Sequence, residues 1–274
     1  MRRALRNPRI VIGTLFLFSL CVLAIFAEQI APFSPVKIYP ADSLQPPSAK
    51  HLFGTDTMGR DVLSRIIHGA RYSLLLGLAA VAISSVLGTT LGLLSGYFGG
   101  KVDTLIMRVM DIGLAFPSVL LALLIIAVLG AGLTSVTIAI GVSATPPFAR
   151  LIRGSVLAIK ETPFIESARA IGAGRFRVVF RHILPEVFAP AITMATLRLA
   201  GAIFSASSLS FLGFGAQPPT PEWGAIVSAA RHQLRGAWWI STFAGLAIMS
   251  TVLAINVLGD GLRDVLDPKL RGKI

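Results

Sequence analysis

Cysteine is nearly absent from this sequence of 274 residues, and charged residues are few. The single cysteine, Cys21, excludes an internal disulfide and a cysteine-based zinc cluster, and its place inside an apolar run indicates a small buried or lipid-facing hydrophobe. Charged residues make up 14% of the chain, against roughly 25% in soluble domains, while hydrophobic residues make up 54%. The composition therefore excludes an ordinary soluble domain and indicates a membrane protein.

Acidic residues are scarcer than basic ones, with 13 Asp and Glu against 25 Lys and Arg, which gives a net charge of +12. In a soluble protein this excess would suggest a nucleic-acid partner. Here the cations lie between apolar runs, so contact with membrane lipid explains them and no nucleic acid is expected.

Motifs of enzyme chemistry are also missing. A Walker A pattern would need a glycine where Ser95 stands and a Ser or Thr where Val102 follows Lys101. The four histidines have neither HExxH spacing nor a neighbouring cluster of Cys or carboxylates. We therefore predict a chain that is not an enzyme and has no catalytic, cofactor-binding or metal-binding residues.

Six stretches are long and apolar enough to cross the hydrocarbon core of a membrane, which takes about 20 residues in a helix. The charge-free stretch 112–149 is too long for one crossing, and we divide it at Gly130 to Gly132. The sequence thus predicts an all-α membrane protein with six transmembrane helices, at residues 10–27, 73–96, 104–129, 133–148, 190–212 and 239–258.

The distribution of cations predicts the orientation of these spans. Six crossings place both ends on one side, and most of the Lys and Arg residues fall inside if that side is the cytoplasm, so both termini are predicted to be cytoplasmic. We expect residues 1–72 to form an N-terminal anchor helix and an extracytoplasmic segment with a surface helix over residues 59–70. Residues 73–274 then form a five-helix core with a cytoplasmic loop at residues 150–190, and a second outer segment carries a short helix over residues 223–230.

Small and polar residues mark candidate contacts inside the membrane. Small side chains recur every fourth position in the second span and predict a face for close helix packing: Ser84, Gly88, Gly92 and Gly96. Several hydroxyls and two larger polar groups in the last two spans are candidates for a translocation path: Arg198, Ser205, Ser207, Ser208 and Asn256. Arg198 would cost about 2.5 to 3.5 kcal/mol at the membrane centre, so it either faces a cavity or extends to the cytoplasmic headgroups. Asn256 is equally explained by a hydrogen bond between helices.

Residues that typically begin or end helices divide the loop 150–190 and predict two short helices in it. In the first, Thr162 is a candidate N-cap, Pro163 suits the first helical position, and Gly172 can adopt the left-handed conformation that ends a helix. We expect Phe164, Ala168 and Ile171 to share its apolar face. A helix of this length is unstable alone, so the rest of the chain or a partner must hold it.

The second helix places apolar and basic side chains on different faces. Its apolar members are Phe176, Val179, Phe180 and Ile183, and its basic members are Arg175, Arg177, Arg181 and His182. Such a helix rests naturally on an anionic membrane surface.

The first of these helices resembles the EAA loop of bacterial ABC importer permeases, through the run Glu166-Ser167-Ala168-Arg169-Ala170-Ile171-Gly172 and the later His182-Ile183-Leu184-Pro185. The resemblance covers nearly the whole chain and narrows to the C-type permease of dipeptide, oligopeptide and nickel importers. Four further stretches carry it: Phe53-Gly54-Thr55-Asp56 with Gly59-Arg60-Asp61, Leu209-Ser210-Phe211-Leu212-Gly213, Pro218-Pro219-Thr220-Pro221 with Trp223-Gly224, and Gly259-Asp260 with Leu262-Arg263-Asp264 and Asp267-Pro268.

This resemblance implies a type I ABC importer permease in a bacterial inner membrane. Two permeases would form the path, two cytoplasmic ATP-binding subunits would bind ATP and Mg²⁺, and an extracytoplasmic binding protein would deliver solute. The implied ATPase-coupling residues are Glu166, Ser167, Ala168, Arg169, Gly172, Leu184 and Pro185. The implied solutes are dipeptides and oligopeptides, with nickel or glutathione as alternatives; an ATP-independent channel or carrier is a further alternative.

The sequence departs from the family pattern at three positions. Ser167 stands where alanine is expected, and His182 stands where an apolar residue is common. Related permeases often carry a Glu shortly before the Leu-Ser-Phe-Leu-Gly stretch, where this chain has Ala206. The last difference leaves the charge preference for the solute open.

Overall fold

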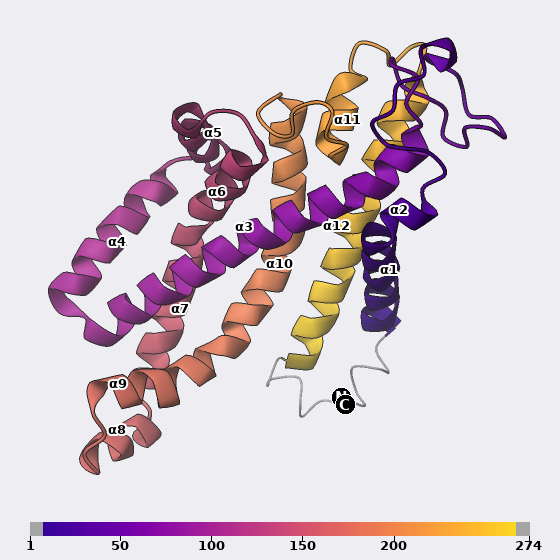
Figure 1. The fold of residues 1–274 in the computed structure, drawn as a ribbon. Coiled ribbons are helices and arrows are strands. Elements are labelled where there is room, and N and C mark those ends of the chain that lie inside the picture. The colour runs from indigo at the N-terminus through magenta and orange to yellow at the C-terminus, as the bar shows by residue number, and fades with distance from the viewer. Residues whose placement is uncertain (1–7, 267–274) are drawn as a thin grey trace. The chain divides into compact units, whose positions relative to one another are not determined.

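The computed structural model describes residues 8–266, and in this range the chain forms helices, turns and loops, with a single isolated β-bridge between Thr55 and Asp61 (Figure 1). The predicted all-α class is therefore confirmed. Six of the eight basic residues at the two ends of the chain, on which the predicted cytoplasmic termini partly depend, lie outside the described range: Arg2, Arg3, Arg6, Lys269, Arg271 and Lys273. The elements are α1 (Pro8–Ile25), α2 (Ala27–Ile30), η2 (Pro40–Asp42), α3 (Val62–Phe98), α4 (Gly100–Ala115), α5 (Ser118–Leu129), α6 (Leu133–Ser143), α7 (Thr145–Lys160), α8 (Pro163–Ala170), α9 (Arg175–Arg177), η3 (Val178–Ile183), α10 (Leu184–Phe211), α11 (Trp223–Ala229) and α12 (Trp238–Leu266).

Five helical segments of the described chain are long and apolar enough to cross a membrane: Pro8–Ile25, Val62–Phe98, Leu133–Lys160, Arg175–Phe211 and Trp238–Gly261. They correspond to five of the six predicted spans. The third predicted span, over residues 104–129, differs because α4 and α5 are bent by 99° at the break between them. Pro117 lies in this break, and Phe116 before it is extended (φ −96°, ψ 140°), as the residue before a proline tends to be.

The separate surface helix expected over residues 59–70 is wrong, because α3 begins at Val62 and continues without a break to Phe98. Its start is fixed by Asp61, whose Oδ2 accepts hydrogen bonds from the backbone N–H of Ser64 (2.8 Å) and from the Ser64 hydroxyl (2.7 Å). The junction between the expected surface helix and the expected span consists of Arg71, Tyr72 and Ser73. None of these is a glycine or a proline, so nothing in the sequence ends the helix before the membrane span begins.

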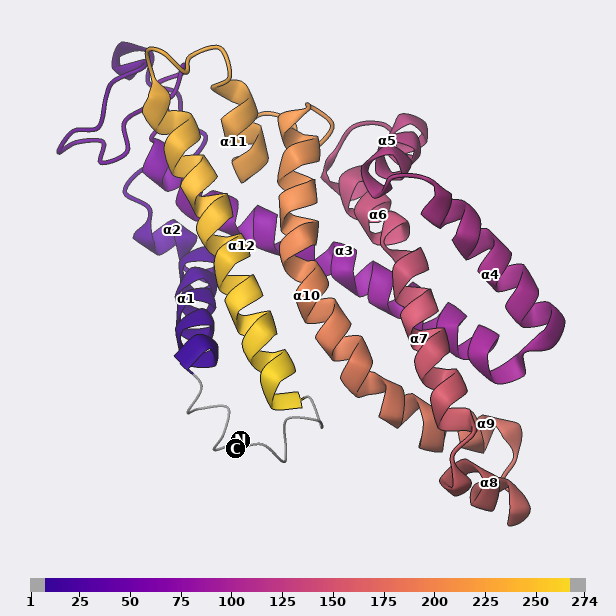
Figure 2. The same cartoon turned by 180° about the vertical axis from the view of Figure 1, so that it is seen from behind.

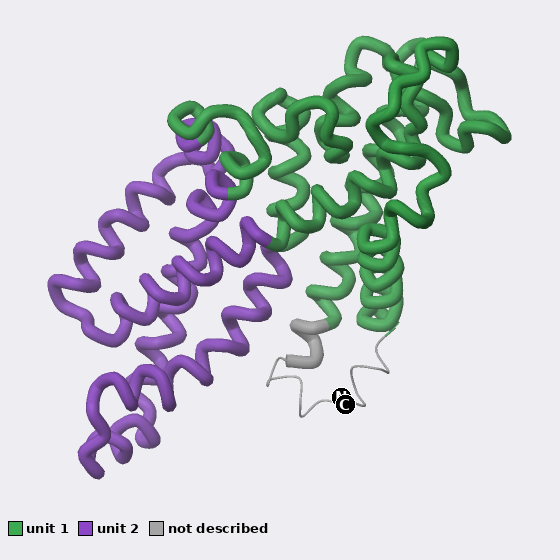
Figure 3. The backbone as a smooth tube through the Cα atoms, in the orientation of Figure 1, with its two compact units in different colours: residues 1–78, 126–137, 199–274 green, residues 79–125, 138–198 purple. Residues whose placement is uncertain are grey.

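The structure divides into two compact units (Figure 3), and the expected division at residue 72 stays a prediction. The first unit contains residues 1–78, 126–137 and 199–274. In it α1 lies beside α12, as both views of the ribbon show (Figures 1 and 2), and Gly13 of α1 allows the approach, since a Cβ there would stand 3.0 Å from the Ala254 carbonyl oxygen.

Tryptophan side chains tie α11 and the segment before α3 to the long helices of the first unit. The indole N–H of Trp239 donates to the carbonyl of Thr55 (3.1 Å), and that of Trp223 donates to the carbonyl of Ile66 (2.9 Å). Trp223 begins α11, which matches the short helix predicted over residues 223–230.

The second unit contains residues 79–125 and 138–198. Its apolar core joins α3, α7, α8 and the run from η3 into α10, with buried members that include Leu93, Ile152, Ile165, Ile183 and Val187. An ion pair joins α4 to α7: the Arg153 guanidinium donates through Nε and Nη2 to the two carboxylate oxygens of Asp103, each at 2.6 Å. This unit contains α8, the helix whose sequence resembles the coupling segment.

Candidate functional site

Helix α8 has a defined start and a defined end. Thr162 is extended (φ −79°, ψ 144°) and Pro163 is the first helical residue, as predicted, although the Thr162 hydroxyl donates to the Ile159 carbonyl (2.7 Å) instead of capping the helix. At the other end Gly172 has φ +84°, the left-handed conformation that its sequence position predicts. The Gly172 N–H donates to the Arg169 carbonyl (2.9 Å) and the Ala173 N–H to the Ala168 carbonyl (3.0 Å). These two bonds form a Schellman motif, which satisfies carbonyls at the helix end.

The buried face of α8 differs from the predicted one. Ala168 is buried as expected, but its buried companion is Ile165, with an exposed fraction of 0%, whereas Phe164 and Ile171 are 56% and 86% exposed. Ile165 belongs to the core of the second unit together with Val178 and Ile183. Ile165 is not among the residues expected on the apolar face, although its place three residues before Ala168 is the signal that could have identified it.

The opposite face of α8 is open. Glu166, Ser167, Arg169 and Ile171 are exposed, and so is Phe164, whose ring meets the His182 ring edge-on at 5.1 Å between centroids. The exposed side therefore offers a carboxylate, a guanidinium, a hydroxyl and two apolar side chains for contact. An eight-residue helix is thus held by its own chain on one side and left free on the other.

The second short helix expected in the loop is not separate from the fifth span. α9, the π-helical turn η3 and α10 follow one another without a break from Arg175 to Phe211. Pro185 has no N–H to donate, and it lies directly after the π-helical turn, where the regular i→i−4 bonding is already interrupted because the Leu184 N–H donates to the Val179 carbonyl, five residues back. Leu184 is half-buried and Pro185 is exposed.

The apolar residues of this run do not form one face as expected. Val178 and Ile183 are buried in the core, whereas Phe176 and Phe180 are 79% and 60% exposed. The two phenylalanine rings stack in parallel at 6.3 Å between centroids. Arg175, Arg177 and Arg181 are exposed along the same run, so its outer side is both aromatic and basic.

The small residues of α3 lie against α7 in the second unit. A Cβ at Gly88 would stand 2.7 Å from the Phe148 Cβ, and one at Gly96 would stand 2.8 Å from the Val156 Cβ. At Gly92 the nearest atom would be the Ala149 carbonyl oxygen, at 2.6 Å. Ser84 is buried, and its hydroxyl donates to the Val81 carbonyl at 3.0 Å within the same helix.

The candidate path residues belong to different units. Arg198 is half-buried in the second unit, and the other four are in the first, so their grouping in one path stays a prediction. Ser207 is 5% exposed, and its Oγ has no hydrogen-bond partner among the described residues. The Ser208 hydroxyl donates to the Phe204 carbonyl at 2.8 Å; Ser205 is half-buried, and Asn256 is exposed.

Solved structures with this fold define its class. The inward-facing methionine ABC transporter MetNI matches with a TM-score of 0.60 at 19% identity, covering 74% of this chain and 96% of that chain. An amino acid ABC transporter solved with histidines matches with a TM-score of 0.56 at 15% identity, covering 72% of this chain and 92% of that chain. The fold is therefore that of an ABC importer permease.

Sequence comparison identifies the family. Residues 88–272 match the model for the binding-protein-dependent transport system inner membrane component, and residues 1–47 match the N-terminal TM domain of oligopeptide transport permease C. The chain belongs to the family of binding-protein-dependent transport system inner membrane components, which confirms the resemblance found in the sequence. It is a multi-pass membrane subunit of the ABC importer class.

Curated relatives are similar over almost the whole chain. The glutathione transport system permease protein GsiD of Escherichia coli is 49% identical, covering 99% of this chain and 90% of the relative. The di/tripeptide transport system permease protein DppC of Pseudomonas aeruginosa is 47% identical, covering 94% and 88%. The dipeptide transport system permease protein DppC of Alkalihalophilus pseudofirmus is 46% identical, covering 97% and 88%.

Proposed function

We propose that the chain is the transmembrane permease subunit of an ATP-driven, binding-protein-dependent importer of dipeptides or oligopeptides. It forms the translocation path with a second permease, while two cytoplasmic ATP-binding subunits bind ATP and Mg²⁺ and an extracytoplasmic binding protein delivers the solute. The relatives named for dipeptides and for di- and tripeptides support a short peptide as the solute. Glutathione, itself a tripeptide, is the second candidate because the relative named for it is 49% identical.

The observation that carries the coupling role is the two-sided environment of α8. Ile165 and Ala168 fix the helix to the core of the second unit, while Glu166, Ser167 and Arg169 are exposed. A helix held in this way can dock into a groove on an ATPase subunit and pass a displacement into α7 and α10 through Ile165. Because a ligand shifts an equilibrium only through contacts that differ between states, the exposed side of α8 is where such contacts form.

A charge reversal on α8 tests this role, with a matched control just before the helix. Glu166→Lys places a cation in the docking surface, whereas Glu161→Lys makes the same charge change at an exposed residue that follows α7. We expect Glu166→Lys to lose peptide uptake and the stimulation of ATP hydrolysis by loaded binding protein in proteoliposomes containing the full importer. Glu161→Lys should retain both. Wild-type coupling in Glu166→Lys would contradict the assignment of α8 as the coupling helix.

The solute is tested in the same proteoliposomes. Uptake of labelled dipeptides, oligopeptides, glutathione and nickel chelates is compared with and without ATP. Peptide uptake that needs both ATP and the binding protein is expected. Uptake that continues in vesicles lacking the ATPase subunits would support an ATP-independent channel or carrier instead.

A further inference from the structure

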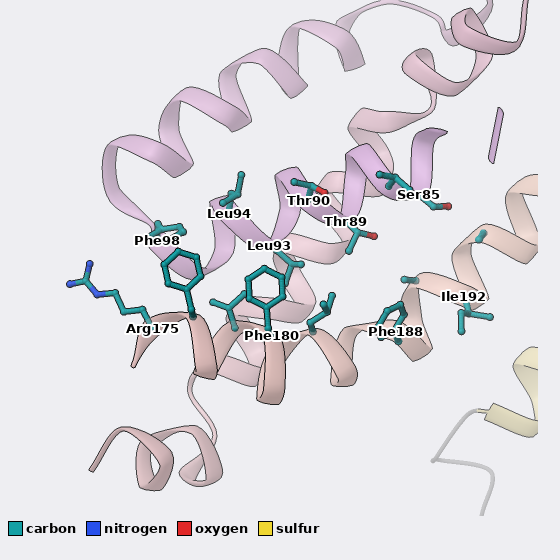
Figure 4. Close-up of a pocket in the computed structure, with 16 residues that line it drawn as sticks. Ser85, Thr89, Thr90, Leu93, Leu94, Phe98, Arg175, Phe180, Phe188 and Ile192 are labelled. Carbon is teal, nitrogen blue, oxygen red and sulfur yellow. The ribbon is translucent and has the colours of Figure 1, made fainter. Parts of the chain in front are cut away.

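A groove of about 730 Å³ lies in the second unit, between the later turns of α3 and the run from α9 into α10 (Figure 4). One wall carries Val86, Leu94 and Phe98, and the other carries Phe180, Phe188 and Ile192. These side chains are between 40% and 65% exposed, so the groove is open and its walls are apolar. The mechanism proposed above uses none of them.

The groove has one charged end. Arg175 is the one charged residue among the described residues that line the groove. Figure 4 shows Arg175 at the same end as Phe98, away from Ser85 and Ile192. Arg177 and Arg181 are exposed on the same helical run, which makes this end of the surface basic. An occupant with an apolar body and an anionic end would match this distribution of charge.

The position of the groove within the membrane, and its length, follow from the helices that form it. Both walls belong to segments apolar enough to span a membrane, and α3 carries no charged residue after Arg71. From Ser85 to Phe98 the groove extends about 20 Å along the helix axis. One leaflet of the hydrocarbon core is about 15 Å thick, so the length of the groove is comparable to one acyl chain lying in a single leaflet.

We infer that this groove binds an acyl chain of an anionic phospholipid, with the lipid phosphate at Arg175. A peptide segment fits less well, because its backbone N–H and C=O groups would lose water in an apolar groove whose described walls offer few polar partners. The reverse orientation of the lipid would place its phosphate beside Ile192, inside the charge-free part of the span.

The inference is tested on the whole importer in nanodiscs with photoreactive phosphatidylglycerol, using phosphatidylcholine with the same acyl chains for comparison. Two matched pairs of variants separate the chain from the headgroup. Val86→Trp fills the groove, whereas Leu87→Trp changes the next exposed residue of α3, which does not line it. Arg175→Gln removes the charge at the groove, whereas Arg177→Gln removes an exposed charge outside it.

We expect phosphatidylglycerol to label peptides of both walls, with labelling lowered at least fivefold by Val86→Trp and little by Leu87→Trp. Arg175→Gln should lower labelling by phosphatidylglycerol about fivefold, because a basic residue near an anionic lipid contributes about that factor, while labelling by phosphatidylcholine changes little. Equal labelling by both lipids in the wild type, or equal effects of Arg175→Gln and Arg177→Gln, would overturn the headgroup assignment. If the groove is unlabelled by lipid and instead crosslinks to the second permease or to transported peptide, the inference is wrong.

Discussion

Gly92 of α3 lies so close to α7 that a Cβ at this position would stand 2.6 Å from the carbonyl oxygen of Ala149. The same Cβ would stand 2.7 Å from the Cβ of Ile152. The first of these atoms is backbone and the second is the root of a β-branched side chain, so neither can move aside without shifting α7. In lipid, where apolar surface gives little driving force between helices, such close approach is a main source of packing energy.

Gly92→Ala is therefore expected to destabilise the second unit by about 1–3 kcal/mol, the usual cost of overpacking. Gly154→Ala is the matched control, because Gly154 is also helical and in the same unit, but a Cβ there would meet no described atom within 4 Å outside its own stretch of helix. It should be neutral or stabilise by up to about 1 kcal/mol through helix propensity. Thermal unfolding in detergent measures both, and equal midpoints for the two variants would contradict the packing argument.

Gly172→Ala is expected to weaken coupling without unfolding the protein. Gly172 has φ +84°, which costs a residue with a Cβ about 1–2 kcal/mol, and this strain acts on the Schellman motif that ends α8. Gly174→Ala is the control, because Gly174 is also exposed but has φ −62°. At either glycine, a Cβ would meet no described atom within 4 Å other than those of the residues next to it in the sequence.

The measurement for this pair is the number of peptides imported per ATP hydrolysed. The ratio should fall for Gly172→Ala and stay at the wild-type value for Gly174→Ala. If both variants behave alike, the left-handed cap has no special role in coupling.

Features that depend on many residues could be predicted from the sequence. A run of about 20 apolar residues has few explanations other than a membrane span, so five spans could be placed correctly. The end of α8 could also be predicted, because glycine is the residue that adopts positive φ at little cost, and Gly172 does so.

Features that depend on a choice between similar residues could not be predicted. Phe164, Ile165 and Ile171 are all apolar, and an eight-residue helix has too few turns for periodicity to decide which of them is buried. Pro117 interrupts an apolar run, but a proline inside a span is compatible with a mild kink as well as with the observed bend of 99°. Arg71 suggests a boundary at the membrane surface, yet a charged residue does not end a helix, and α3 continues through it.

Glu222→Gln is expected to destabilise the first unit. The Glu222 side chain is fully buried, and its Oε1 accepts hydrogen bonds from the Gly224 N–H (3.0 Å) and the Ser73 hydroxyl (3.2 Å), while Oε2 accepts from the Ala225 N–H (2.9 Å). An amide has one acceptor oxygen, so its NH₂ group would face one of these donors at a cost of about 1–3 kcal/mol. Glu28→Gln, at an exposed residue of the same unit, should leave the unfolding midpoint unchanged.

The pKa of Asp42 depends on Lys50. The hydrogen bond from the Lys50 ammonium to Asp42 Oδ2 (2.7 Å) holds the pKa of this carboxyl below its ordinary value. Because the folded-state pKa is lowered, the ion pair stabilises the fold above the ordinary pKa of about 4, and this stabilisation is lost as the pH falls through the folded-state value. Lys50→Gln should therefore raise the pKa of Asp42, measured by carboxyl-carbon NMR on the intact protein with Asp42→Asn for assignment. An unchanged titration would show that the ion pair is not formed in solution.

The orientation of the chain is tested with single cysteines in a Cys21→Ser background. The positive-inside rule places the basic loop 150–190 in the cytoplasm and the segment before α3 outside. Ala49 and Ser167 are both exposed in the structure, so a cysteine at either position can react with a maleimide that reaches it. In intact spheroplasts a membrane-impermeant maleimide should label Ala49→Cys and not Ser167→Cys, and after permeabilisation it should label both.

Labelling of Ser167→Cys in intact spheroplasts would place α8 outside the cell, where no ATPase could reach it. Failure to label it after permeabilisation of membranes that lack the ATPase subunits would instead show that α8 is buried in lipid. Either result removes the physical basis for coupling through this helix, because a docking surface must face the compartment that contains its partner.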